Sequence, residues 1–206
     1  MSAAGVILLL AAGASSRWGR PKALLDWRGT PLVHHLARVA LEAVGSGGRV
    51  VRVLGAHAAA IGAVPGPAEV ADVFNPDWSL GMGASIACGL RAALARDPGL
   101  AAAVVLPCDQ PLVSAAHLRL CLATARGVSQ ALVNTDYGDG QAGPPAGFGS
   151  AYFAELLALS GDEGGRVVLR RHHEHLISLP APECRWDLDS ASELEKLTNH
   201  LGFPLS

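Results

Sequence analysis

The apolar segment Val6-Ile-Leu-Leu-Leu10 and the loop that follows it, Ala11-Ala-Gly-Ala-Ser-Ser-Arg-Trp-Gly-Arg-Pro-Lys22, decide the fold of this chain. A short run without polar residues is typical of a strand buried on both faces, as in a parallel sheet. A glycine-containing loop after such a strand can point several backbone N–H groups at one anion. Together they predict an α/β domain with an anion site at the end of its first strand.

Apolar runs and helical periodicities alternate through the rest of the sequence. Further strands are expected at 50–54, 70–74, 102–106, 131–134 and 176–179. Helices are expected to begin at Thr30, Ser85, Ser114 and Ser190, with Thr30 and Ser114 as N-caps and Ser190 in a capping box with Glu193. This alternation favours a doubly wound α/β sheet. No repeat or linker interrupts the pattern, so residues 1–206 are expected to form one domain.

Composition narrows the class of protein. Of the 206 residues, 50% are hydrophobic and 17% are charged, and the formal net charge is −2. No general basic surface exists for a nucleic-acid backbone, so phosphate binding should be local. The longest apolar run, Val6 to Ala12, is too short to span a bilayer, which needs about 20 residues, and no basic residue precedes it as in a secretory signal. Four cysteines without C-x-x-C spacing indicate reduced thiols. A cytoplasmic protein with neither a nucleic-acid nor a membrane partner is expected.

The loop after the first strand is the strongest candidate for a binding site. Ligands of such sheets lie beyond the carboxyl ends of the strands, where this loop is expected together with those after Phe74 and Leu106. Arg17 and Lys22 would add two positive charges to a triphosphate cradle. The loop matches neither the Walker A pattern nor G-x-G-x-x-G. Taken alone, it is also consistent with a solvated loop that carries two cations by chance.

Three aspartates are candidate metal ligands. Asp109 follows a buried strand, and a carboxylate there can hold Mg²⁺, although Asp is also common in turns and caps. Asp187 and Asp189 lie two residues apart, so in an extended segment both would point to one face and approach one metal. A capping role before the last helix competes with that interpretation. Cys108 is expected to be a buried thiol at the end of its strand rather than a catalytic group.

Five segments resemble, in order, the motifs of the MobA-like nucleotidyltransferases, and within them most of all those of the molybdenum cofactor cytidylyltransferases. They are Leu10–Leu25, Asn75–Ser85, Leu106–Pro111, Gly161–Arg166 and Asp187–Ser190. Any one of them would be a weak signal, but five in order cover nearly the whole chain. The resemblance implies a three-layer, Rossmann-like α/β fold with a mostly parallel sheet.

The resemblance also implies roles for individual residues. The implied catalytic residues are Arg17, Lys22 and Asp109, and the implied metal ligands are Asp109 with Asp187 or Asp189. The implied nucleotide site consists of Leu10, Ala11, Ala12, Gly13, Arg17, Lys22, Gly81, Gly83 and Ser85. In that site the glycines would permit close approach to base or ribose and Ser85 would donate a hydrogen bond, whereas a simple turn before a helix is the structural alternative. The implied acceptor site consists of Gly161, Asp162 and Arg166.

Two departures from the family pattern bear on the substrates. Guanylyltransferases of the family usually carry Gly-Gly where this chain has Ala12-Gly13, and Asp-Lys where it has Pro21-Lys22, which points to CTP. The family often has Lys at position 163 and Ala at position 165, where this chain has Glu163 and Gly165. The lost cation bears on the identity of the anionic acceptor more than on the class of reaction.

The reaction that the resemblance implies is transfer of CMP from CTP to the phosphate of a molybdenum-loaded pterin, with Mg²⁺ as cofactor and pyrophosphate as the leaving group. Transient docking to a molybdoenzyme or its chaperone would follow. One alternative is an NAD(P)H-dependent oxidoreductase on the same scaffold, similar to nicotine blue oxidoreductases, which the missing G-x-G-x-x-G disfavours. The others are a noncatalytic carrier of the finished cofactor and a transferase that acts on a different acceptor, such as a sugar phosphate.

Overall fold

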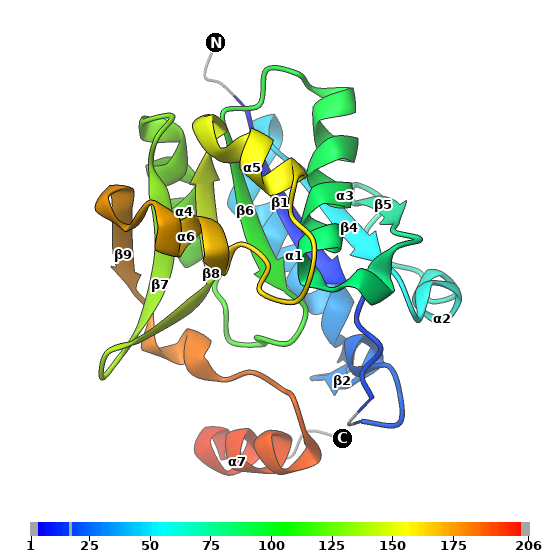
Figure 1. Ribbon diagram of the computed structural model, residues 1–206. Coiled ribbons are helices and arrows are strands. Elements are labelled where there is room, and N and C mark those ends of the chain that lie inside the picture. Colours follow the sequence, from blue (N-terminus) through cyan, green and yellow to red (C-terminus); the bar gives the residue numbers. More distant parts are fainter. Residues whose placement is uncertain (1–3, 17, 203–206) are drawn as a thin grey trace.

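The computed structural model describes residues 4–16 and 18–202, and its centre is one seven-stranded sheet (Figure 1). From edge to edge the strands are β5 (Ala71–Phe74), β4 (Arg49–Leu54), β1 (Gly5–Ala11), β6 (Ala102–Pro107), β8 (Gln141–Gly149), β7 (Leu132–Gly138) and β9 (Leu176–Pro180). Strand β8 runs antiparallel to both of its neighbours, and the other pairs are parallel. The sheet is therefore mostly parallel, as predicted.

Helices cover both faces of the sheet and complete the predicted three layers. One face packs against α1 (Leu32–Val44) and α4 (Ala115–Gly127), and the other against α3 (Met82–Arg96), α5 (Phe153–Leu157) and α6 (Arg166–Arg171). Helix α2 (Ala58–Gly62) follows β4, and α7 (Ala191–Leu201) ends the described chain below the sheet in Figure 1. The short strands β2 (Asp26–Trp27) and β3 (Thr30–Pro31) form a separate hairpin. No helix in the described residues is long and apolar enough to cross a membrane.

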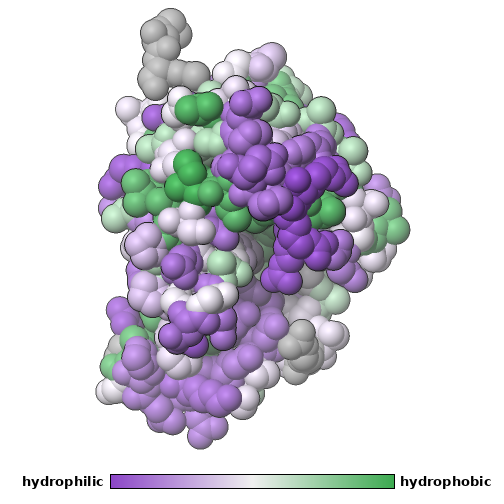
Figure 2. Space-filling model, turned by 60° about the vertical axis from the view of Figure 1, so that its left-hand side comes forward, coloured by the Kyte–Doolittle hydropathy of each residue, from purple (hydrophilic) through white to green (hydrophobic). Residues whose placement is uncertain are grey.

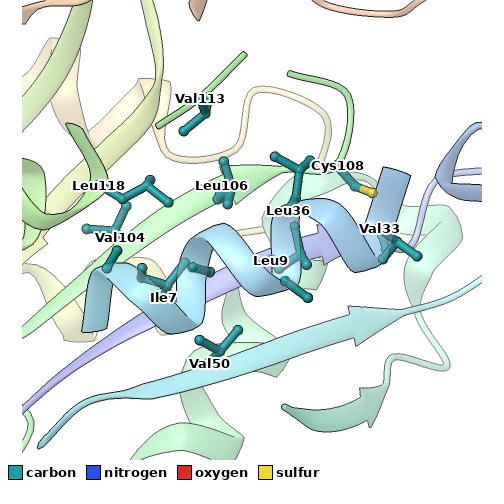
Figure 3. Packing of buried hydrophobic residues seen from close by; sticks show 14 of the residues in the cluster. Ile7, Leu9, Val33, Leu36, Val50, Val104, Leu106, Cys108, Val113 and Leu118 are labelled. Carbon is teal, nitrogen blue, oxygen red and sulfur yellow. The ribbon is translucent and has the colours of Figure 1, made fainter. Parts of the chain in front are cut away.

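The central strands are apolar because they are buried on both faces. Strands β1 and β6 are neighbours, and Val6, Ile7, Leu8 and Leu9 are fully buried. Successive side chains of a strand point to opposite faces, so Ile7 and Leu9 join the cluster with Leu36 of α1 while Val6 and Leu8 join the cluster with α3. Figure 3 shows the first of these clusters. The uninterrupted apolar run that opens the sequence thus reflects its place in the middle of the sheet.

Two expected helix starts are wrong. Thr30 does not cap α1, because it pairs with Trp27 in the β2–β3 hairpin and α1 begins at Leu32. Helix α3 begins at Met82 instead of Ser85, which places Ser85 inside its first turn. The other two caps are confirmed: the side chains of Ser114 and Ser190 accept hydrogen bonds from the backbone N–H groups three residues later.

Strand β8 was not expected from the sequence, because Gln141–Gly149 contains two prolines and three glycines. Pro144 and Pro145 lie where the β7–β8 register shifts, and the β6–β8 register ends at Ala146. A proline is tolerated at such an irregularity because no ladder partner needs its missing N–H. The proline carbonyls are used instead: Pro145 accepts a hydrogen bond from Thr135 Oγ1 and Pro144 from Gln110 Nε2.

Candidate functional site

Three segments that are far apart in the sequence meet at the carboxyl ends of β1 and β6. The backbone N–H of Cys108 donates to the carbonyl of Leu10, 3.1 Å away, and that of Leu188 donates to the carbonyl of Asp109, 2.8 Å away. The indole Nε1 of Trp18 then donates to the carbonyl of Leu188 at 3.0 Å. Leu188 is buried, so it anchors the C-terminal segment and holds the flanking aspartates beside the two loops.

Lys22 lies at the centre of this junction. Its Nζ donates to Asp109 Oδ2 at 2.6 Å and to Asp189 Oδ1 at 3.0 Å, and its backbone N–H donates to Ser15 Oγ. The side chains of Lys22 and Asp109 are 22% and 18% exposed, so water screens this pair only partly. Burial acts to lower the pKa of Lys22, but the charges and hydrogen bonds of the two aspartates outweigh it and raise the pKa above 10.5. Lys22 is therefore a fixed cation at neutral pH.

Asp187 faces the same junction from the other side of Leu188. Partial burial, followed by the negative charges of Asp109 and Asp189, raises the pKa of Asp187 above its ordinary 3.8. Asp187 thus lies within electrostatic reach of the two carboxylates that contact Lys22. Both C-terminal aspartates line the larger cavity, and Asp189 also accepts a hydrogen bond from Lys22.

The donor set suits a hard divalent cation. Within residues 4–16 and 18–202, no three acidic, histidine or cysteine side chains are gathered into a complete metal site. Mg²⁺, however, is commonly held by one or two carboxylates together with the phosphates of a substrate. Asp109 and Asp189 contact the ammonium group of Lys22, and Asp187 adds a further negative charge near them. The residues therefore fit the predicted cation, provided that a substrate supplies further ligands.

Two cavities adjoin at this junction. The smaller, of about 450 Å³, lies over the loop after β1 and the start of α3; the larger, of about 800 Å³, lies between the sheet and α6. Both are lined by Lys22, Met82, Pro107, Asp109 and Asp162. In Figure 2, hydrophilic residues dominate the lower part of the face at the height of α7. The arrangement provides two compartments with a cation and a carboxylate at their boundary.

The smaller cavity gathers most of the predicted nucleotide-binding residues. Those that line it are Leu10, Ala12, Gly13, Lys22, Gly81 and Ser85. Ala11 is buried at the end of β1, and Gly83 is buried under Ser160, so neither is among the lining residues. Arg17 lies outside the described residues. Ser85 is buried and accepts a hydrogen bond from Asn75 Nδ2 at 3.1 Å, which accounts for its place beside this cavity.

Gly81, which precedes α3, and Gly83, in its first turn, lie close to the backbone of another segment. Gly81 has a φ of +109°, and a Cβ at this position would lie 2.4 Å from the carbonyl carbon of Gly161. The N–H of Gly83 donates to the carbonyl of Gly161 at 2.9 Å, and the N–H of Gly161 donates to the carbonyl of Leu80. Glycine is needed at these two positions because the backbone of residues 160–162 packs directly against them. This packing places Asp162 at the boundary of the two cavities.

Gly81→Ala is expected to lower the free energy of unfolding by about 2 kcal/mol or more, because the new Cβ meets immobile backbone at an unfavourable φ. Urea denaturation measures the change. Gly62→Ala is the matched control, since a Cβ at Gly62 meets nothing within 4 Å. An equal effect at both positions would contradict the steric explanation.

Two of the three predicted acceptor-binding residues line the larger cavity. Asp162 and Arg166 line it, whereas Gly161 connects its loop to α3 through the backbone. Glu163, which replaces the lysine common in the family, accepts a hydrogen bond from Arg170 at 2.7 Å. The glycine at position 165 has a steric explanation, because a Cβ there would lie 2.7 Å from Cζ of Phe148 on the sheet.

Several residues of the larger cavity were not predicted: Gln110, Asn134, Arg170 and Arg185. Gln110 directly follows Asp109 within a quoted motif, and Asn134 is a polar residue at the end of an apolar run, so both had a weak local signal. Arg185 had none, because only the path of the chain after β9 brings it to the cavity. Cys108 is the buried thiol that was predicted, and burial raises its pKa to about 12.

Comparison with known proteins agrees with this architecture. The family described as the MobA-like NTP transferase domain matches residues 7–176. Nicotine blue oxidoreductase from Paenarthrobacter nicotinovorans is 46% identical over 108 residues, which is 52% of this chain and 50% of the relative. Molybdenum cofactor guanylyltransferase from Xanthomonas euvesicatoria pv. vesicatoria (strain 85-10) is 34% identical over 119 residues, or 58% and 54%. The chain spans about half the length of these curated relatives.

A solved structure extends the likeness over the whole fold. Rv0371c from Mycobacterium tuberculosis H37Rv is 27% identical with a TM-score of 0.79, and the match covers 97% of this chain and 100% of that one. Its complex with manganese is 28% identical with a TM-score of 0.71, covering 95% and 97%. The family match includes the loops that carry Lys22 and Asp109 and most of the sheet. The chain is thus a member of the MobA-like NTP transferase domain family.

Proposed function

We propose that this chain is a nucleotidyltransferase that moves CMP from CTP to the phosphate of a molybdenum-loaded pterin and releases pyrophosphate. The observation that carries the proposal is the pair of adjoining cavities with Lys22 and Asp109 at their boundary. A transfer between two anionic substrates requires two compartments and neutralisation where they meet. Family membership and the guanylyltransferase relative support the class of reaction.

The smaller cavity would hold CTP. The loop after β1 presents backbone over this space, and Gly13 is open to it, since a Cβ there would meet nothing within 4 Å. Backbone N–H groups in such a loop bind phosphate. Lys22 would place its ammonium against the phosphates at the boundary, and Arg17 belongs to the same loop. Ala12-Gly13 and Pro21-Lys22 support the choice of CTP over GTP through the family pattern alone.

The larger cavity would hold the acceptor, with its phosphate directed to the boundary. An oxygen of that phosphate attacks the α-phosphorus of CTP, and the bond from this phosphorus to the bridging oxygen of the β-phosphate breaks. Pyrophosphate carries away the electron pair. Lys22 stabilises the charge that develops on the leaving group, and Arg166 neutralises the acceptor. No covalent intermediate with the protein is needed.

A divalent cation, proposed as Mg²⁺, would be held by Asp109 with Asp187 or Asp189 and would polarise the α-phosphate. The manganese complex of the Mycobacterium tuberculosis relative supports a divalent cation in this fold. In the described structure Lys22 bridges Asp109 and Asp189, so Asp187 is the aspartate whose charge is less compensated.

The proposal is tested by pyrophosphate release with CTP, GTP, ATP and UTP in turn, with Mg²⁺ or Mn²⁺, and with or without the molybdenum-loaded pterin. Release that requires both CTP and the acceptor is expected. A preference for GTP would retain the class of reaction and overturn the base assignment. No release with any triphosphate, from folded protein with a competent acceptor, would overturn the transferase.

A second candidate is an NAD(P)H-dependent oxidoreductase, which the 46% identity to nicotine blue oxidoreductase favours. Oxidation of NADPH in the presence of a quinonoid dye, by the same protein that fails to release pyrophosphate, would select it. The carboxylate–lysine junction has no evident task in hydride transfer, which is why the transferase is preferred.

A further inference from the structure

The wall of the larger cavity contains two buried side-chain oxygens without a hydrogen-bond partner in the described structure, Gln110 Oε1 and Asn134 Oδ1. The side chain of Asn134 makes no hydrogen bond within the described residues, although Asn134 is only 9% exposed. A buried amide in that condition costs about 1–3 kcal/mol. Such a group at a cavity wall indicates a ligand that completes its bonding.

The strand geometry places Asn134 on the side of the cavity. Its neighbour Thr135 points to the opposite face, where its Oγ1 bonds His117 of α4. Because side chains alternate along a strand, Asn134 faces α6. Asn134 also lies at the register shift between β7 and β8. Irregularities of this kind often change the direction of a side chain next to a binding site.

The orientation of the Gln110 amide is determined by its partners. Its Nε2 lies 2.8 Å from the carbonyl oxygen of Cys184 and 3.1 Å from that of Pro144. Carbonyl oxygens only accept hydrogen bonds, so the atom facing them must be the NH₂ group. The remaining atom, Oε1, is therefore an acceptor held in a fixed position. Asn134 has no such partners, so its amide is free to present either its donor or its acceptor.

One part of the cavity wall is apolar, while charged residues such as Arg166, Arg170 and Arg185 line other parts of it. Between the sheet and α6 the apolar part consists of Val105, Ala146, Phe148, Leu169 and Leu176. A volume of about 800 Å³ lies in the range of cavities that hold small molecules. A flat ring system fits apolar walls, and polar groups along one edge of that ring would meet the two amides.

We infer that Asn134, with Gln110 Oε1 on the same wall, binds the 2-amino-4-oxopyrimidine edge of a bicyclic heterocycle such as a pterin. This edge carries adjacent N–H donors and a carbonyl acceptor, which one amide can pair with through two hydrogen bonds while Gln110 Oε1 accepts another N–H. The inference rests on the proposed function and assigns the specificity-determining residue of its acceptor cavity.

The test is direct binding of 6-hydroxymethylpterin, without CTP, followed by quenching of its fluorescence. Asn134→Leu, of similar volume, is expected to weaken binding at least tenfold. Its unfolding temperature should be unchanged or higher, since an unpaired buried amide is removed; a merely structural asparagine would give a loss. Asn134→Asp keeps the shape without the N–H donors and is expected to weaken binding as well.

Gln141→Leu is the matched control, because Gln141 is an exposed residue of β8 outside the cavity, and its affinity should equal that of the unchanged protein. Binding of CTP should be the same in all variants. Equal pterin affinity in Asn134→Leu would overturn the inference. Pyrophosphate release with the molybdenum-loaded pterin but no pterin binding to the unchanged protein would overturn the inference and leave the proposed function standing.

Discussion

Asp109→Asn is expected to lower kcat for pyrophosphate release about a thousandfold and to change the unfolding temperature little. Asp109 Oδ2 lies at the boundary of both cavities, 2.6 Å from Lys22 Nζ. An amide retains the shape and one acceptor oxygen but loses the charge with which Asp109 is proposed to hold a divalent cation. Stability should be nearly retained, because Lys22 keeps its bond to Asp189.

The control for this change is Asp139→Asn, at a positive-φ position in the β7–β8 turn where asparagine is tolerated. It removes the same charge at a residue that lines neither cavity and should leave kcat unaltered. The measurement is initial rate at saturating CTP and acceptor, with thermal unfolding of each variant. A kcat of Asp109→Asn within threefold of that of the unchanged protein would show that Asp109 does not hold the cation.

Lys22→Met is expected to lower kcat about 10²- to 10³-fold and to cost roughly 1–3 kcal/mol of stability at pH 7. The change removes the ammonium that both Asp109 and Asp189 contact and retains an unbranched apolar side chain of similar length. The remaining carboxylates, including Asp187, then repel one another in a partly buried site. Under the proposed mechanism, the leaving pyrophosphate also loses the charge stabilisation that Lys22 would supply.

The pH dependence identifies the cause of that stability loss. Without Lys22 the folded variant takes up protons more readily than its unfolded chain, so its stability falls as pH rises through the range where the carboxylates ionise. The deficit relative to the unchanged protein should be largest at pH 7 and shrink towards pH 4–5. The raised pKa of Asp187 changes stability in the same direction, because the folded state favours the protonated form of this carboxyl group. Thermal unfolding across this pH range measures both.

Two further measurements test whether the stability loss of Lys22→Met comes from the lost charge: addition of a divalent cation and the conservative variant Lys22→Arg. Mg²⁺ or Mn²⁺ should raise the unfolding temperature of Lys22→Met more than that of the unchanged protein, because the ion supplies the missing charge and binds only the folded state. Lys22→Arg should recover much of the stability. If the deficit of Lys22→Met is the same at pH 5 and pH 7, it arises from lost packing instead of charge.

Much of the fold could be predicted from sequence because burial on both faces leaves a local mark. Val6–Leu9 and the residues of β6 are apolar without interruption since helices cover each face of the sheet. Strand β8 could not be predicted, because its two prolines are tolerated only where the β7–β8 register shifts and the pairing with β6 has ended. That condition belongs to the neighbouring strands and leaves no pattern in residues 141–149.

The candidate site likewise has a part that could be predicted from the sequence and a part that could not. Lys22 and Asp109 could be predicted because each follows a recognisable strand, and the ends of parallel strands meet at one edge. The sequence left open which C-terminal aspartate binds the metal, and it did not show which of them contacts Lys22. Buried Leu188 decides which one contacts Lys22, since its hydrogen bonds to Asp109 and Trp18 direct Asp189 to Lys22.

The sequence by itself therefore determined the class of fold, the buried strands and the loops that carry the charges, because these depend on residues that are neighbours in the chain. Only the tertiary structure decided how the loops combine: the bridge from Lys22 to two aspartates, the backbone contact that requires Gly81, and the amides of Gln110 and Asn134 in one cavity wall. These depend on contacts between residues up to 167 positions apart. No local pattern encodes such contacts, because each side chain is compatible with many partners until packing selects one.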